Sequence, residues 1–218
     1  MCYTGRMKTS TQEIFEELFT RYPALEVCRA DVRAAFDALA ATYRAGGKAL
    51  CCGNGGSASD CEHIVGELLK KFKRHRDIPA ALKARLAAAG PDGSHLAARL
   101  EGSLPAISLV SQSGILTAFA NDVGWDEAFA QQLLGLAKPG DMLVTLSTSG
   151  NSRNCVLAAM LARALDVRTL ALTGSSGGRL GEVCDVTIRV PAHETYQVQE
   201  FHLPVYHALC AMLEEELF

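Results

Sequence analysis

The sequence predicts an α/β fold, a three-layer αβα sandwich in which helices cover both faces of a mostly parallel sheet. Helical patterns alternate with short apolar segments, and several of these segments end in turns rich in Gly and Ser. Strands that alternate with helices form βαβ units, which join into a parallel sheet. Ligands bind beyond the carboxyl ends of the strands in such sheets, so we expect a site at these turns. The five candidate strands are Lys48–Cys52, Ala106–Val110, Met142–Leu146, Arg168–Leu172 and Val186–Val190.

Two amphipathic helices are predicted ahead of the first strand, within residues 11–45. Ser10 and Glu13 have the spacing of a capping box at the start of the first helix, which should end near Pro23. The second should extend from Leu25 to Arg44. Both helices carry an apolar stripe, which must pack on the main domain or on another copy of the chain.

The first strand leads into a glycine turn and a helix, over the residues Asn54, Gly55, Gly56 and Ser57. Glycine lets the backbone approach a ligand closely, Ser57 is a candidate helix cap, and free N–H groups at a helix start favour an anion. Most turns of this kind only change the chain direction. Further along, His63 and Glu67 are four residues apart and share one helix face, where they could bind a metal or move protons. A solvated polar face with an incidental His is the alternative.

Residues 78–104 are rich in Ala and Leu and predict two helices broken at Gly90–Gly93. This segment separates the first unit from the second strand by more than a compact connection requires, so we interpret it as an inserted helical hairpin. Further helices are expected around Leu116–Asn121 and Asp126–Ala137.

The third strand leads into a second polar loop, Ser147–Ser152, with a helix following it to Leu165. The loop offers four hydroxyl groups and no Lys, unlike a Walker A loop, which needs its Lys for a nucleotide triphosphate. It therefore suits a phosphate ester. A single turn of this kind would usually be plain capping, but two at the ends of parallel strands favour a phosphate site.

A final helix is predicted from Glu194 to the end of the chain, with a kink at Pro204. Gln199, His202 and His207 are polar residues on this otherwise apolar segment. Any one of these His residues could simply be a hydrogen-bonded core residue.

Composition excludes several classes of protein. The 218 residues are expected to form a single domain, 1–218. A net charge of -3 gives no electrostatic reason to bind nucleic acid or an anionic membrane. Eight Cys residues without Cys-x-x-Cys spacing argue against a disulfide framework and a zinc ribbon, and we expect a cytoplasmic location. No apolar segment approaches the roughly 20 residues of a membrane-spanning helix.

With these motifs in order, the chain resembles the sugar isomerase (SIS) domain family, and within it the phosphoheptose isomerases. Those enzymes interconvert sedoheptulose 7-phosphate and D-glycero-D-manno-heptose 7-phosphate. The resemblance covers nearly all of the chain from about residue 11 except the inserted hairpin. The motifs that carry it are Cys52–Ser57, Asp60 with His63 and Glu67, Asn121–Asp122, Ser147–Ser152, Leu172–Gly174, and Gln199–Glu200 with His202 and His207.

The resemblance implies a homotetramer with active sites between subunits and an aldose–ketose isomerisation through an enediolate. Glu67 would be the base and His207 would act as acid and base on the oxygens. One zinc ion per subunit is implied, bound by His63, Glu67, Gln199 and His207. The substrate-binding residues it implies are Asn54, Gly55, Gly56, Ser57, Asn121, Asp122, Ser147, Thr148, Ser149, Ser152 and Gln199.

Two departures bear on the substrate. Tyr196 and Gln197 stand where some relatives place an acidic residue, and the inserted hairpin is absent from the best known heptose isomerases. Another sugar phosphate is therefore a possible substrate. The alternatives from other classes are a non-catalytic SIS regulator, such as the one that binds the bacterial replication initiator, and a sugar-phosphate sensor.

Overall fold

The computed structural model describes residues 7–218; the first six residues of the predicted domain lie outside that part. Its centre is a sheet of five parallel strands in the order β2-β1-β3-β4-β5. The strands are β1 (Ala49–Gly53), β2 (Ala106–Ser108), β3 (Met142–Leu146), β4 (Arg168–Thr173) and β5 (Val186–Arg189). The predicted α/β class and parallel sheet are confirmed.

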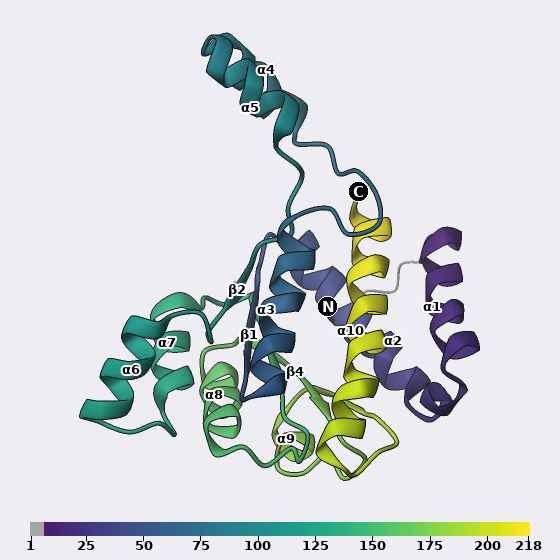
Figure 1. Ribbon diagram of the computed structural model, residues 1–218, viewed down its shortest axis with the longest axis vertical. Coiled ribbons are helices and arrows are strands. Elements are labelled where there is room, and N and C mark those ends of the chain that lie inside the picture. Colours follow the sequence, from purple (N-terminus) through teal and green to yellow (C-terminus); the bar gives the residue numbers. More distant parts are fainter. Residues whose placement is uncertain (1–6) are drawn as a thin grey trace.

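Helices cover both faces of the sheet, as Figure 1 shows. The helices before the hairpin are α1 (Thr9–Arg21), the 3₁₀ helix η1 (Pro23–Cys28), α2 (Arg29–Arg44) and α3 (Gly56–Leu69). The hairpin consists of α4 (Ala80–Ala88) and α5 (Pro91–Arg99). The remaining helices are α6 (Ser113–Asp122), α7 (Ala128–Leu136), α8 (Arg153–Ala164), α9 (Leu180–Val183) and α10 (Thr195–Leu217).

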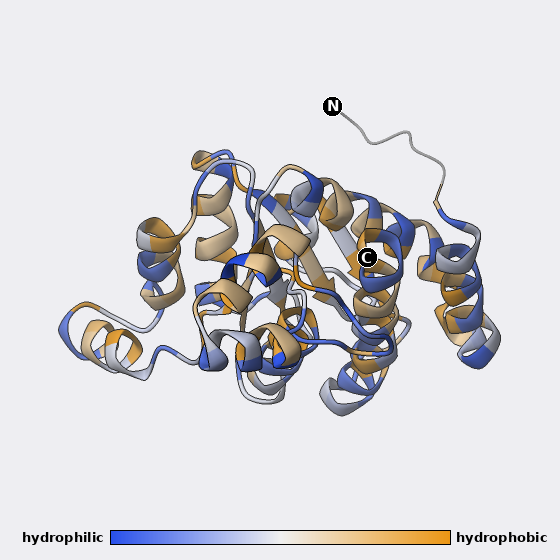
Figure 2. Ribbon diagram, turned by 90° about the horizontal axis from the view of Figure 1, so that it is seen from above, coloured by the Kyte–Doolittle hydropathy of each residue, from blue (hydrophilic) through white to orange (hydrophobic). Residues whose placement is uncertain are grey.

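Two apolar cores flank the sheet. One joins side chains of α1, α2, α3 and α10 to one face, and the other joins α6, α7, α8 and α9 to the opposite face. Buried Phe36 of α2 and Phe129 of α7 are among the largest side chains of these cores. In Figure 2, hydrophobic and hydrophilic residues alternate around most helices, as expected for helices with one face on a core. Three layers result.

The predicted hairpin is present and extends away from the sheet (Figure 1). No residue of α4 is buried, and the two helices pack mainly on each other. The backbone N–H of Gly102 donates to the carbonyl of Arg76 at 2.9 Å, so the two ends of the excursion are tied together at its base.

Three local predictions are wrong. The second helix does not begin at Leu25, because residues 23–28 form η1 and the α-helix starts at Arg29. The capping box at Ser10 does not form: α1 begins at Thr9, and the Ser10 hydroxyl donates instead to Glu215 of α10 at 2.7 Å. Ser57 is not the cap of α3, because Gly55 holds the N-cap position. In the case of Ser10, a tertiary contact replaced the local one.

Three further features complete the description of the fold. α10 continues through Pro204 without interruption from Thr195 to Leu217. All seven Cys residues within the described part of the chain are free thiols. Over residues 7–218, no helix combines the length and the apolar character needed to cross a bilayer.

Candidate active site

A pocket of about 290 Å³ lies where β1 and β3 end. Both predicted polar loops line it, together with the first two turns of α10. Its lining residues are Asn54, Gly55, Gly56, Ser57, Leu146, Ser147, Thr148, Ser152, Thr195 and Gln199. The sequence-predicted loops therefore do meet at one edge of the sheet, as neighbouring parallel strands require.

The first loop is shaped by two glycines. Gly55 has a φ of 56°, a conformation that side chains disfavour, and α3 starts at the next residue. A Cβ on Gly56 would lie 2.5 Å from the Nε2 atom of Gln199. Glycine at this position therefore lets the Gln199 amide of α10 lie directly against the first turn of α3, whose N–H groups at Ser57 and Ala58 donate to the carbonyls of Asn54 and Gly55.

In the second loop, Ser147 and Ser152 line the pocket, whereas Ser149 does not. The Oγ atoms of Ser147 and Ser152 are 2.9 Å apart, and both residues line the pocket. Ser149 is exposed, does not line the pocket, and its Oγ accepts the backbone N–H of Asn151 at 3.1 Å. The α8 helix begins just after the loop, at Arg153. Of the predicted phosphate-binding residues, Ser147, Thr148 and Ser152 are therefore in place within a single chain.

Asn54 reaches the pocket in an unexpected way. Its side-chain amide forms a reciprocal pair with that of Asn154: each Nδ2 donates to the other Oδ1, at 2.9 Å and 2.8 Å. The pair joins the loop after β1 to the first turn of α8. Sequence reasoning missed Asn154, because a buried Asn in the first turn of a helix has no distinguishing pattern.

The predicted acid–base residues gather between α3 and α10. The Nε2 atom of His63 lies 3.3 Å from Oε1 of Glu67 and 3.4 Å from Nε2 of His207. Glu67 keeps only 13% of its side chain exposed, and its Oε2 pairs with Lys70 Nζ at 3.0 Å. Burial and the neighbouring His63 lower the pKa of His207. A carboxylate and two imidazoles thus share one small region.

Two more polar residues support this cluster. The hydroxyl of Tyr206 lies 3.0 Å from Nδ1 of His63 and 3.2 Å from Oδ1 of Asp60. Burial, reinforced by the Asp60 carboxylate, raises the pKa of Tyr206. Burial also raises the pKa of Asp60. The sequence motif included Asp60 but gave no sign of Tyr206.

The donor set can be compared with that of a zinc site. Ligand atoms about 2.0–2.1 Å from a tetrahedral zinc ion lie about 3.4 Å from each other. The two separations at His63, to Glu67 and to His207, match this value. Among residues 7–218, however, no group of three or more His, Cys, Asp and Glu side chains is arranged so that it could hold a metal ion. The three side chains are of types that bind zinc, but within one chain they do not form a metal site.

Gln199, the fourth predicted ligand, lies elsewhere. It is eight residues before His207 on the unbroken α10 helix, which corresponds to about 12 Å of helix rise. Asn121 and Asp122 are not among the residues that line the pocket; both are exposed at the end of α6, where the Asn121 amide donates to Asp122 at 2.9 Å. Within a single chain, the serine-lined pocket and the cluster of His63, Glu67 and His207 are thus two separate sites.

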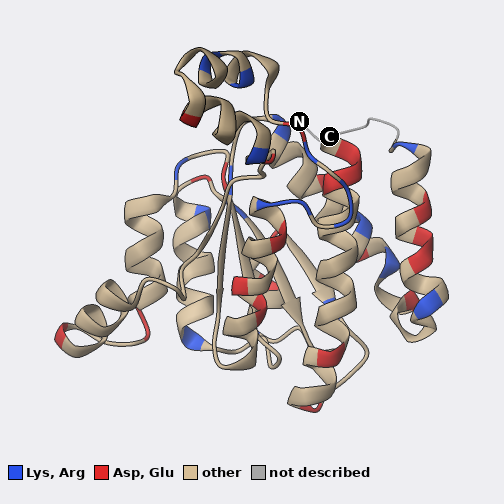
Figure 3. Ribbon diagram, turned by 45° about the horizontal axis from the view of Figure 1, so that its top comes forward, with Lys and Arg blue, Asp and Glu red and all other residues tan. Residues whose placement is uncertain are grey.

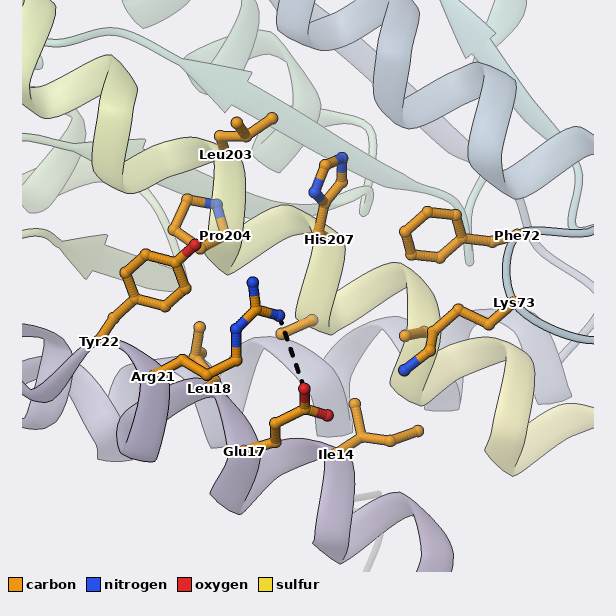
Figure 4. A pocket seen from close by; sticks show the side chains of 12 residues that line it. Ile14, Glu17, Leu18, Arg21, Tyr22, Phe72, Lys73, Leu203, Pro204 and His207 are labelled. Atoms are coloured by element: carbon orange, nitrogen blue, oxygen red, sulfur yellow. Dashed lines mark ion pairs between the residues drawn. The ribbon is translucent and has the colours of Figure 1, made fainter.

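A second cleft, also of about 290 Å³, reaches His207 from the side of α1 (Figure 4). Its floor is apolar, with Leu18 and Pro204 among the lining residues. Arg21 of α1, Lys73 of the loop after α3 and His207 of α10 line it from three elements. Glu17 lines the cleft as well and pairs with Arg21 at 3.6 Å, so His207 faces a cleft that carries both cationic and anionic side chains.

Comparisons with known proteins agree with this arrangement. The family model for the SIS domain matches residues 92–174. The phosphoheptose isomerase of Akkermansia muciniphila is 42% identical over 81% of this chain and 80% of its own length. That of Rhodospirillum rubrum is 39% identical over 87% and 88%. The structure of a phosphoheptose isomerase from Francisella tularensis superposes with a TM-score of 0.73 at 29% identity, covering 95% of this chain and all of that one.

Proposed function

Because the chain belongs to the phosphoheptose isomerase family of SIS-domain proteins, we propose that it interconverts sedoheptulose 7-phosphate and D-glycero-D-manno-heptose 7-phosphate. The reaction is an aldose–ketose isomerisation. The observation that carries the proposal is the convergence of Glu67, His63 and His207 on helices whose other ends border the serine-lined pocket. An acid–base cluster and an anion pocket are the two parts that such an enzyme needs.

The pocket would hold the phosphate of the sugar. Ser147, Thr148 and Ser152 line it together with Gly56 and Ser57 at the start of α3. Such neutral donors, with no Lys in the loop, bind a phosphate ester through hydrogen bonds and the helix dipole. Ser149 would join them only after its loop turns, since its hydroxyl now accepts the Asn151 N–H.

Proton transfer would fall to Glu67 and His207. Glu67 would take a proton from C1 of the ketose and return it to C2, through an enediolate. His207 would accept the proton of one sugar oxygen and give a proton to the other, so that the atoms balance. The low exposure of Glu67 keeps its carboxylate away from bulk water, which strengthens its interactions with a bound sugar.

Zinc is part of the proposal. His63, Glu67 and His207 would hold the ion, with Gln199 supplied by a second copy. The bound ion would supply positive charge to the sugar oxygens. Support comes from the two donor separations at His63, which are those of tetrahedral zinc ligands.

We also propose that active sites form between the subunits of a homotetramer in the cytoplasm. Gln199 and His207 of one chain are about 12 Å apart along α10, which is far beyond the reach of a shared metal ion. Asn121 and Asp122 do not line the pocket of their own chain. Both observations are explained if the pocket of one copy faces the Glu67 cluster of another.

The direct test is to incubate the purified protein with sedoheptulose 7-phosphate, with and without zinc, and to measure aldose formation. Five- and six-carbon sugar phosphates are assayed in parallel. We expect aldose to form from the seven-carbon ketose, and Glu67→Gln to lower kcat about 10²–10⁴-fold because a general base is lost. Glu62→Gln is the matched control, since Glu62 is exposed on the same helix and its carboxylate accepts a hydrogen bond from the Ser111 hydroxyl. Full activity of Glu67→Gln would contradict the mechanism, and ligand binding without turnover by the wild type would identify a sensor.

A further inference from the structure

Tyr206 lies between two polar side chains of α3, although it belongs to α10. Its hydroxyl is 3.2 Å from Oδ1 of Asp60 and 3.0 Å from Nδ1 of His63. The residue is 2% exposed, and its ring meets the His63 ring edge-on, with centroids 5.5 Å apart. The hydroxyl therefore has two protein partners and little access to water.

The chemistry of these groups fixes the direction of both hydrogen bonds. A phenol has one proton to donate, and an ionised carboxylate can only accept. The Tyr206 O–H therefore donates to Asp60, and the remaining lone pairs of its oxygen face His63. Nδ1 of His63 must then carry the proton and donate to Tyr206. In the neutral imidazole this leaves Nε2 with a free lone pair.

That lone pair points to the acid–base cluster. Nε2 of His63 is the atom that lies 3.3 Å from Glu67 and 3.4 Å from His207. With the opposite tautomer, Nε2 would carry a proton and donate it to Glu67, which would occupy both the carboxylate oxygen and the imidazole nitrogen. The tautomer of His63 therefore decides whether the cluster can accept a cation.

We propose that Tyr206 is a positioning residue that, together with Asp60, holds His63 in the Nδ1–H tautomer with its Nε2 lone pair toward Glu67 and His207. The inference rests on the proposed function insofar as the cation is zinc. Groups that hold the second nitrogen of a metal-binding His orient the ring and strengthen the ligand, and their loss typically costs 10–100-fold in metal affinity.

The test uses the full chain and two variants, Tyr206→Phe and Asp60→Ala. Tyr206→Phe keeps the ring and removes the acceptor of the Nδ1 proton. Asp60→Ala removes the acceptor of the Tyr206 proton, so the hydroxyl is free to donate to His63 and invert its tautomer. Tyr43→Phe is the matched control, because the Tyr43 hydroxyl is buried and has no hydrogen-bond partner among residues 7–218.

Two measurements decide the outcome. Zinc affinity, from competition with a chelator, should fall at least about tenfold in both variants and stay unchanged in Tyr43→Phe. Nitrogen-15 NMR of the metal-free protein at about pH 8, where imidazoles are neutral, should show Nδ1–H at His63 in the wild type and a shifted tautomer ratio in both variants. An unchanged tautomer in the variants, or Nε2–H in the wild type, would overturn the proposal.

The NMR measurement separates this inference from the proposed function. It reports the hydrogen-bond chain in the absence of metal and substrate. A wild type that neither binds zinc nor isomerises the sugar, but shows Nδ1–H lost in Tyr206→Phe, would refute the proposed function and leave the positioning role standing.

Discussion

At the scale of single residues, side chains in the candidate site are held by one another before any ligand is present. Asn54 and Asn154 share two hydrogen bonds between their amide groups, and Ser147 and Ser152 share one between their hydroxyl groups. Binding a ligand to groups that are already ordered costs less conformational entropy than ordering them at the moment of binding. The loop after β1 therefore depends on Asn154, which is not itself among the predicted substrate-binding residues.

The pair between Asn54 and Asn154 can be tested by Asn154→Ala. The change leaves the Asn54 amide without its partner and loosens the loop beside the first turn of α3. We expect KM for the sugar phosphate to rise about tenfold with kcat little changed, because a partly buried hydrogen-bonding group costs about 1–3 kcal/mol when it loses its partner. Steady-state kinetics would measure this. An unchanged KM would show that the pair has no part in ordering the pocket.

The buried His202 makes stability depend on pH. Burial lowers its pKa to about 4 in the folded chain, from 6.5 for an exposed imidazole. The unfolded chain therefore binds a proton between these values that the folded chain does not. Stability is fully present above pH 6.5 and decreases as the pH falls, by about 2 kcal/mol between pH 7 and pH 5 from this group alone.

Urea unfolding at the two pH values would measure that loss. His202→Gln cannot take up the proton, so the variant should show a drop smaller than the wild type by about 2 kcal/mol. Equal drops in the two proteins would mean that other groups cause the pH dependence.

At the scale of elements, the loop after α3 is fastened to the end of α10. Figure 3 shows the basic loop beside the acidic residues at the C-terminal end of that helix. The guanidinium of Arg76 is fully buried; it donates to Glu214 at 2.7 Å and to the backbone carbonyls of Leu68 and Glu67 at 2.7 Å and 2.9 Å. Glu214 also accepts three backbone N–H groups of the loop, from residues 72–74. Arg76 thus caps the helix that carries Glu67.

Removing Arg76 should destabilise the fold strongly. Arg76→Ala leaves a buried Glu214 without its charged partner and two helix carbonyls without donors, and we expect a loss of about 3–5 kcal/mol in the free energy of unfolding. Arg76→Lys should recover little, because a single ammonium group does not match three acceptors in different directions. The control is Arg74→Ala. The Arg74 side chain is half-exposed, and its ion pair with Glu215 should contribute less than about 1 kcal/mol to stability. Chemical denaturation would measure all three, and similar losses at Arg74 and Arg76 would contradict this account.

The elements also show how far the sequence could be interpreted. Strand positions were predictable because buried parallel strands are short apolar segments, and Met142–Leu146 was correct to the residue. Loops rich in Gly and Ser located the pocket. The predicted capping box at the start of α1 was wrong because Ser10 instead contacts Glu215, a residue far away in the sequence. The roles of Asn154 and Tyr206 could not be predicted, since each depends on which helices become neighbours.

At the scale of the whole molecule, the hairpin and the exposed apolar residues indicate surfaces that a single chain leaves uncovered. α4 has no buried residue, and Leu82, Leu96 and Leu100 of the hairpin segment are 40–47% exposed. Val123 and Trp125, after α6, are 66% and 48% exposed. Such residues next to Asn121 and Asp122 agree with a site completed by a second copy of the chain.

Mixing two inactive variants tests whether one site uses two copies. Glu67→Gln removes the base but leaves the pocket intact, and Ser147→Ala combined with Ser152→Ala damages the pocket but leaves the base intact. If a site joins the pocket of one copy to the Glu67 of another, co-refolding the two variants in equal amounts should restore up to about a quarter of wild-type activity, because a quarter of the sites then draw both intact parts. If both parts come from one chain, no site in the mixture is complete and activity stays at the level of the separate variants. Each variant refolded alone is the control, and size-exclusion chromatography with light scattering shows whether mixed oligomers have formed.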